Sequence, residues 1–187
     1  MKKVKEIIVP AIALFIICLV ATFLLGGTDL LTKDKIAEVQ AKAAQEARLT
    51  VCPGAVDFSE TVVEVNGASY SVFEGTDEEG NTVGYAVTAF DKSYGGTIQI
   101  MTGFDKELKV TGVEILSIDD TPGLGMNAKK AEFRQQFVGK TGELTVSKQA
   151  SADNEIQALT GATITSKAVT RCVSAAYAAV IEMGGAN

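Results

Sequence analysis

The feature that most constrains this chain is a run of nineteen residues without a charge, residues 7–25, near its N-terminus. About 20 apolar residues at ~1.5 Å rise per residue cross the hydrocarbon core of a bilayer, so the run predicts a membrane-spanning helix. Pro10 falls in the first turn of that helix, where a missing N–H costs little. A cleaved signal peptide is the alternative, because Gly27 leaves cleavage possible, but the run is long for one and no convincing Ala-x-Ala site follows it.

Positive charges flank this run on one side. Lys2, Lys3 and Lys5 precede it, whereas the segment after it begins Gly-Gly-Thr-Asp. The positive-inside rule therefore keeps the N-terminus in the cytoplasm and exports the rest of the chain. We expect a single-pass protein of the cell (inner) membrane, in which residues 1–27 are the cytoplasmic N-terminus and anchor and the C-terminal domain is extracytoplasmic.

Charge and composition exclude several classes of function. The net charge is −6, and it is −8 without residues 1–27, whereas nucleic-acid binding needs a basic face. The absence of histidine excludes Ser-His-Asp and Cys-His nucleophile systems and His-liganded metal sites. Cys18, Cys52 and Cys172 form no CxxC unit, so we expect no metal site. Cys52 and Cys172 either pair as a disulfide outside the cytoplasm or pack unpaired.

The body of the chain alternates apolar and polar residues in a way that predicts a sheet. Strand-like segments lie at 61–65, 69–73, 82–90, 97–104 and 109–118, and Asn66-Gly67 between the first two is a strong hairpin signal. Helical patterns lie at 29–48, 129–137 and 164–183, with one more strand at 143–147. This order predicts an α+β fold: a mainly antiparallel sheet packed with helices, preceded by one N-terminal transmembrane helix. We expect a linking helix within residues 28–52 and one domain over residues 53–187.

Three glycine-containing turns carry the candidate chemistry. They read Ser93-Tyr94-Gly95-Gly96, Thr121-Pro122-Gly123-Leu124-Gly125 and Thr160-Gly161-Ala162-Thr163. None matches the Rossmann or P-loop glycine motifs. The last turn comes just before the C-terminal helix, and a helix N-terminus can bind an anion. On spacing alone an N-capping turn is the favoured interpretation, and a phosphate site is the alternative.

The three turns, in this order, resemble the FMN-binding domain family. Residues 160–163 resemble its S/T-G-A-T flavinylation motif, and residues 121–125 match its T-P-G-L-G loop. An upstream Tyr94-Gly95-Gly96, followed by a strand and Gly103-Phe104-Asp105, completes the pattern. Two positions depart from it: Gln157 stands where the family usually has aspartate, and Asp119-Asp120 stands where it often has histidine and glutamate.

The resemblance implies a covalent flavin. A threonine hydroxyl carries FMN through a phosphoester bond in this family, and Thr163 fills that acceptor position. The same resemblance places the other cofactor-binding residues at Thr160, Gly161, Ala162, Thr165, Asp120, Thr121, Gly123, Leu124, Gly125 and Tyr94. Thr165 is the main rival as acceptor. The redox chemistry would come from FMN, so no catalytic side chain is expected.

Within this family the chain resembles the G subunits of Rnf-type complexes, the ion-translocating ferredoxin:NAD oxidoreductases. That resemblance implies a membrane-anchored, electron-carrying subunit of a redox-driven ion translocase. Its partners would be the other membrane subunits and, for maturation, a flavin transferase. Two alternatives remain: the C subunit of sodium-translocating NADH:quinone reductases, which has the same motifs in a longer chain, and a non-catalytic, membrane-anchored binding domain.

Overall fold

The first of two compact units is the N-terminal part of one long helix. The computed structural model describes residues 2–184 and divides the chain into Met1–Lys42 and Ala43–Asn187. Helix α1 (Lys2–Val51) contains a stretch long and apolar enough to cross a membrane, with its large apolar side chains exposed. The sequence predicts a distinct helix from residue 29, but α1 continues through Gly26 and Gly27. Its only proline, Pro10, lies far from these glycines. No backbone N–H is therefore lost near Gly26 and Gly27, and the helix can continue through them.

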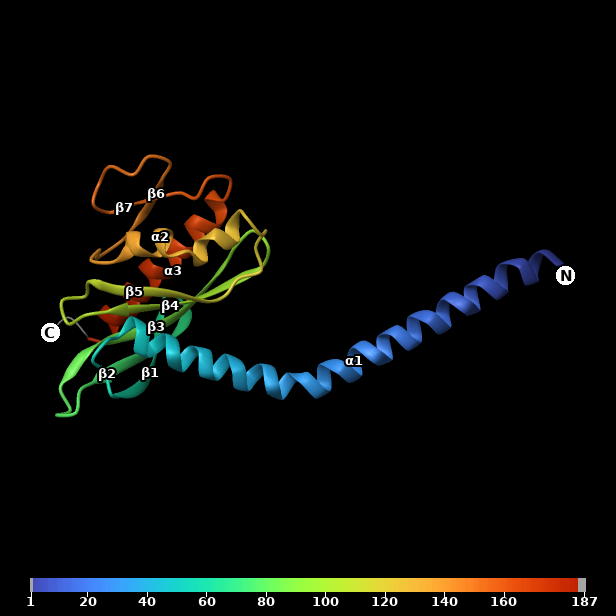
Figure 1. The fold of residues 1–187 in the computed structure, drawn as a ribbon, viewed down its shortest axis with the longest axis horizontal. Helices are drawn as coiled ribbons and strands as arrows, with labels where there is room; N and C mark the ends of the chain where they lie inside the picture. The colour runs from blue at the N-terminus through green and yellow to red at the C-terminus, as the bar shows by residue number, and fades with distance from the viewer. Residues whose placement is uncertain (1, 185–187) are drawn as a thin grey trace. The chain divides into compact units, whose positions relative to one another are not determined.

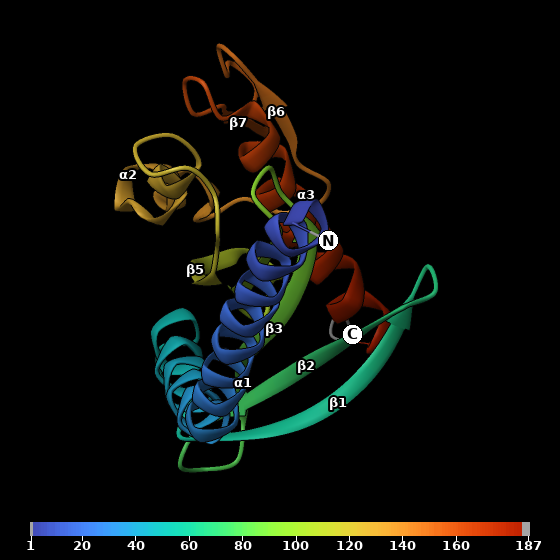
Figure 2. The same cartoon turned by 90° about the vertical axis from the view of Figure 1, so that its right-hand side faces the viewer.

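The second unit is built on a five-stranded antiparallel sheet whose strands follow one another in sequence order (Figure 1). The strands are β1 (Asp57–Val65), β2 (Ala68–Thr76), β3 (Thr82–Lys92), β4 (Thr97–Phe104) and β5 (Val110–Ser117). Figure 2 shows β1 and β2 as a long, curved hairpin. Asn66 and Gly67 form its turn, and both have the positive φ that a two-residue hairpin turn requires. The α+β fold with a mainly antiparallel sheet is therefore confirmed.

The segment after β5 differs from the sequence prediction. The sequence predicts one helix at 129–137, but the structure has η1 (Gly125–Lys129), α2 (Ala131–Arg134) and η2 (Gln135–Phe137). Lys130 has extended backbone angles and separates the first two, so no single helix can form. The strand expected at 143–147 is shorter, β6 (Thr145–Ser147), and it pairs in parallel with β7 (Glu155–Gln157). The sequence analysis missed β7, which is only three residues long.

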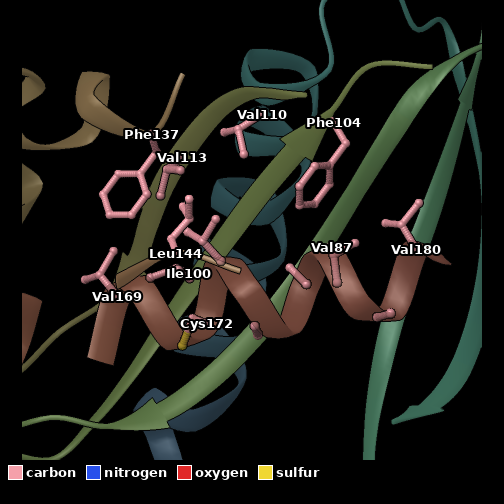
Figure 3. Packing of buried hydrophobic residues seen from close by; sticks show 14 of the residues in the cluster. Val87, Ile100, Phe104, Val110, Val113, Phe137, Leu144, Val169, Cys172 and Val180 are labelled. Carbon is pink, nitrogen blue, oxygen red and sulfur yellow. The ribbon is translucent and has the colours of Figure 1, made fainter. Parts of the chain in front are cut away.

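Helix α3 (Thr163–Glu182) covers one face of the sheet and forms the main core with it. Figure 3 shows Val169, Cys172 and Val180 on this helix close to Val87 and Ile100 of the sheet. Each of these side chains is at most 1% exposed. Burying a valine or isoleucine contributes about 1.5–3 kcal/mol, so this interface holds α3 against the sheet.

The last turns of α1 pack on the opposite face of the sheet. Ala47 and Val51 form a second buried cluster with Phe73, Ala86 and Met101. Thr111 donates a hydrogen bond to the Val51 carbonyl oxygen. Residues 43–51 of α1 therefore belong to the same compact unit as the sheet.

Glycines on the sheet make room for this helix end. Gly103 of β4 and Gly112 of β5 are direct partners across the strands. A Cβ on Gly103 would lie 1.9 Å from the Val51 carbonyl oxygen, closer than any real contact. A Cβ on Gly112 would lie 3.5 Å from the Val51 Cα, an ordinary contact. Only the Gly103 position therefore requires glycine for this packing.

The two buried cysteines lie on opposite faces of the sheet. Cys52 follows α1 and lies near Gly75 and Gly84, whereas Cys172 belongs to the core under α3. Both are free. Burial raises the pKa of the Cys172 thiol to about 12, so it stays protonated and unreactive at neutral pH. The structure thus favours the interpretation that these cysteines pack unpaired.

We predict that Gly103→Ala lowers the free energy of unfolding by about 1–3 kcal/mol, because the new methyl group displaces the end of α1. Gly112→Ala is the matched control, and it should be neutral or slightly stabilising, since glycine within a strand costs conformational entropy. Chemical denaturation of the full chain in detergent, followed by circular dichroism, measures both. Equal destabilisation by the two substitutions would contradict this account of the packing.

Candidate functional site

A cleft lies where the β3–β4 turn, the loop after β5 and the N-terminus of α3 come together. Its volume is about 450 Å³, within the range of small-molecule and cofactor sites. The lining residues come from all three sequence motifs: Tyr94, Asp120, Thr121, Leu124, Gly125, Gly161, Ala162, Thr163, Ile164 and Thr165. Turns separated by up to about 70 positions therefore form one site.

A buried carboxylate joins the three segments. Asp120 is 3% exposed, and its Oδ2 accepts hydrogen bonds from the hydroxyls of Ser93 and Thr165, both at 2.5 Å. Its Oδ1 accepts the backbone N–H of Gly95 at 2.6 Å. A carboxylate carries no donor of its own, so it can satisfy all three neighbours at once.

These donors also determine the charge state of Asp120. Burial is the largest single influence, and it raises the pKa of the carboxyl group. The hydrogen bonds from Ser93, Thr165 and Gly95 together outweigh burial and hold the pKa of Asp120 below its ordinary value. Asp120 is therefore ionised at neutral pH.

Gly125 lets the T-P-G-L-G loop close over this network. A Cβ at this position would lie 2.5 Å from Asp120 Oδ2 and 2.7 Å from Thr165 Oγ1. Any side chain would separate the loop from α3. Gly123, in the same loop, has a φ of +77° and open space around it, so it serves the turn and does not line the cleft.

The N-terminus of α3 presents unpaired backbone donors to the cleft. Ala162 is the N-cap residue, and no side chain caps the helix. The first N–H groups of a helix have no partner within it, and together with the helix dipole they attract an anion. Ser166 holds the preceding turn in place, because its hydroxyl donates to the Ala162 carbonyl oxygen and accepts the N–H of Leu159. The capping-turn and phosphate-site interpretations are therefore compatible here.

The structure separates the three threonines of this segment. Thr165 is 1% exposed, and its hydroxyl is engaged with Asp120. Thr163 is half-buried and lines the cleft, whereas Thr160 is exposed and lies outside the lining. Of the three, only Thr163 lines the cleft without donating a hydrogen bond to Asp120.

The rim of the cleft is apolar. Tyr94, Leu124 and Ile164 are 73%, 43% and 53% exposed, and each comes from a different one of the three segments. Sequence reasoning named Tyr94 and Leu124 as cofactor-binding residues but missed Ile164, and it placed Ser93 in the first candidate turn without assigning it a role. Ile164 and Ser93 stand directly beside a motif, so only the folded arrangement shows that they belong to the site.

Comparison with known proteins identifies the family. The model of the FMN-binding domain matches residues 93–178, and that of the RnfG N-terminal region matches residues 1–51. The G subunit of the proton-translocating ferredoxin:NAD(+) oxidoreductase complex of Clostridium ljungdahlii is 35% identical over 92% of this chain and 90% of its own. The chain belongs to this G-subunit family.

Other relatives agree with this assignment. The G subunit of the Na(+)-translocating ferredoxin:NAD(+) oxidoreductase complex of Acetobacterium woodii is 36% identical, over 91% of this chain and 89% of its own. Among solved structures, the C subunit of the Na(+)-translocating NADH-quinone reductase from Parabacteroides distasonis has a TM-score of 0.60. It covers 82% of this chain and 96% of its own at 18% identity, which shows a shared fold.

Asp120 also generates a prediction about acid stability. Its folded pKa lies below the unfolded value of about 4, so its stabilising contribution is complete above pH ~4 and is lost as the pH falls below that value. Asp120→Asn should lower the free energy of unfolding at pH 7 by about 1–3 kcal/mol, because a buried donor loses its acceptor. The difference from the wild type should shrink below pH ~4. Denaturation curves from pH 3 to 7 measure it, and a difference that is constant across this range would contradict the assignment.

Proposed function

We propose that this chain is the electron-carrying G subunit of an ion-translocating ferredoxin:NAD oxidoreductase complex, with FMN joined to Thr163 through a phosphoester. One observation carries the proposal: the cleft collects all three motifs, and Thr163 lines it without donating a hydrogen bond to Asp120. The redox reaction in this proposal is the one that the names of the G-subunit relatives state, between ferredoxin and NAD(+). The other membrane subunits of such a complex are the expected partners.

The residues of the cleft fit FMN chemically. The uncapped N-terminus of α3 offers N–H donors and a partial positive charge where the phosphate of Thr163-bound FMN would lie. Gly161 is exposed and leaves its backbone open to close approach, and Tyr94, Leu124 and Ile164 provide apolar surface for a ring. When bound, FMN supplies reversible electron transfer, and the chain supplies position and electrostatics.

Attachment of the flavin requires a second protein. The Thr163 Oγ would attack the flavin-bearing phosphorus of a flavin dinucleotide. The new O–P bond forms as the phosphoanhydride bond breaks, the nucleoside monophosphate leaves, and the hydroxyl proton passes to a base, without any change of oxidation state. Asp120, the only carboxyl group in the cleft lining, already accepts three hydrogen bonds. We therefore assign the base and the donor nucleotide to a flavin transferase.

The membrane anchor completes the proposal. Helix α1 has one candidate membrane span near the N-terminus, and lysines precede it in the sequence. We propose that α1 stays uncleaved and that the FMN-binding domain lies on the extracytoplasmic side. A separate redox domain held at the membrane in this way can exchange electrons with membrane-embedded partners.

Thr163→Val tests the attachment site. The substitution keeps the volume of the side chain and removes the acceptor hydroxyl, so the protein should fold but lose in-gel flavin fluorescence after denaturing electrophoresis. The full chain must be co-expressed with a flavin transferase. Thr145→Val is the matched control, because it removes an exposed hydroxyl of β6 outside both the cleft and the flavinylation motif, and it should keep the label. Fluorescence of Thr163→Val at the wild-type level would show that this assignment is wrong.

Protease treatment tests the topology. In intact spheroplasts that express the full chain, added protease should digest the FMN-binding domain, since we place it outside the cytoplasm. A cytoplasmic marker protein serves as the control for membrane integrity. Complete protection of the domain, with digestion only after lysis, would place it on the other side of the membrane.

A further inference from the structure

Among the residues that the structure describes, none is a cationic partner for the charge of Asp120. All three of its hydrogen-bond donors are neutral groups, two hydroxyls and one backbone N–H. Within the part of the chain that the structure describes, none of the ion pairs includes Asp120. The N-terminus of α3 offers a partial positive charge, roughly half an elementary charge, which offsets the carboxylate incompletely. A net negative charge therefore remains in the wall of the cleft.

This charge acts on whatever occupies the cleft. Asp120 is 3% exposed and is also a lining residue of the cavity. A buried charge is screened by salt far less than a surface charge, and its interactions are stronger in the low dielectric of the protein. Electrons on a flavin bound in the cleft would add negative charge near this carboxylate, and like charges repel.

We propose that the uncompensated carboxylate of Asp120 lowers the reduction potential of the flavin. This inference rests on the proposed function, because it needs FMN in the cleft. It assigns to Asp120 an electrostatic role beyond that of tying three segments together. Tying the segments together would by itself explain the hydrogen bonds that Asp120 accepts. The test must therefore separate the effect of its charge from the effect of its hydrogen bonds.

Asp120→Asn removes the charge and keeps a side chain of the same shape with an oxygen acceptor. In the flavin-labelled full chain in detergent, spectroelectrochemical titration should give a more positive midpoint potential than the wild type. The shift should persist at high salt, since the charge is buried. Asp120→Ser is the second variant, because it also removes the charge and keeps a hydrogen-bonding oxygen.

Two controls keep the charge of Asp120 in place. Asp119→Asn removes the neighbouring carboxylate, which is exposed and therefore screened, so its shift should be much smaller. Ser93→Ala removes one donor of the network and leaves the carboxylate ionised, so the potential should not rise. If the potential of Asp120→Asn rose only because the cleft had loosened, Ser93→Ala should raise the potential as well.

Several outcomes would overturn the proposal. They are an unchanged potential in a labelled Asp120→Asn protein, an equal rise in Ser93→Ala or Asp119→Asn, or the failure of both Asp120 variants to fold with flavin attached. The last result would show that Asp120 serves only the architecture of the cleft. A wild-type protein that carries no flavin would instead contradict the proposed function.

Discussion

The cleft depends on the hydrogen bonds that converge on the buried carboxylate of Asp120. Ser93, Gly95 and Thr165 belong to segments 25 to 45 positions away from Asp120, and this one side chain holds them within 2.6 Å of its oxygens. Gly125 then closes over the network because it has no side chain. An ionised carboxylate is well suited to this task, since it only accepts hydrogen bonds and accepts several at once. The same ionised carboxylate places a negative charge in the wall of the cleft where we propose that the cofactor binds.

The sheet carries a second constraint on its other face. The end of α1 fits against Gly103 so closely that its Val51 carbonyl oxygen leaves no space for a Cβ. Val51 is fully buried, and it shares a cluster with Phe73, Ala86 and Met101. The compact unit that contains the sheet therefore begins at Ala43, upstream of residue 53, where the sequence alone places the start of the FMN-binding domain. A soluble version that begins at residue 53 would expose this cluster.

The sequence contained enough information for the fold class and for most of the cleft. Each strand is a local pattern, and Asn66-Gly67 marks its own hairpin. The motifs are contiguous, so resemblance could name Thr163 and the T-P-G-L-G loop. Hydrogen bonds between residues such as Asp120 and Thr165, 45 positions apart, leave no local pattern, so the network and the role of Ser93 were not foreseen. Residues 129–137 likewise have a helical pattern, but the extended backbone of Lys130 divides them.

Mapping the flavin directly on the protein tests the central claim. Trypsin cleaves after Lys148 and Lys167, so residues 149–167 form one peptide that contains Thr160, Thr163 and Thr165. Tandem mass spectrometry of this peptide, from the full chain matured with a flavin transferase, locates any adduct to a single residue. The account predicts a phosphoester-linked FMN on Thr163. An unmodified peptide, or FMN on Thr160 or Thr165, would contradict it.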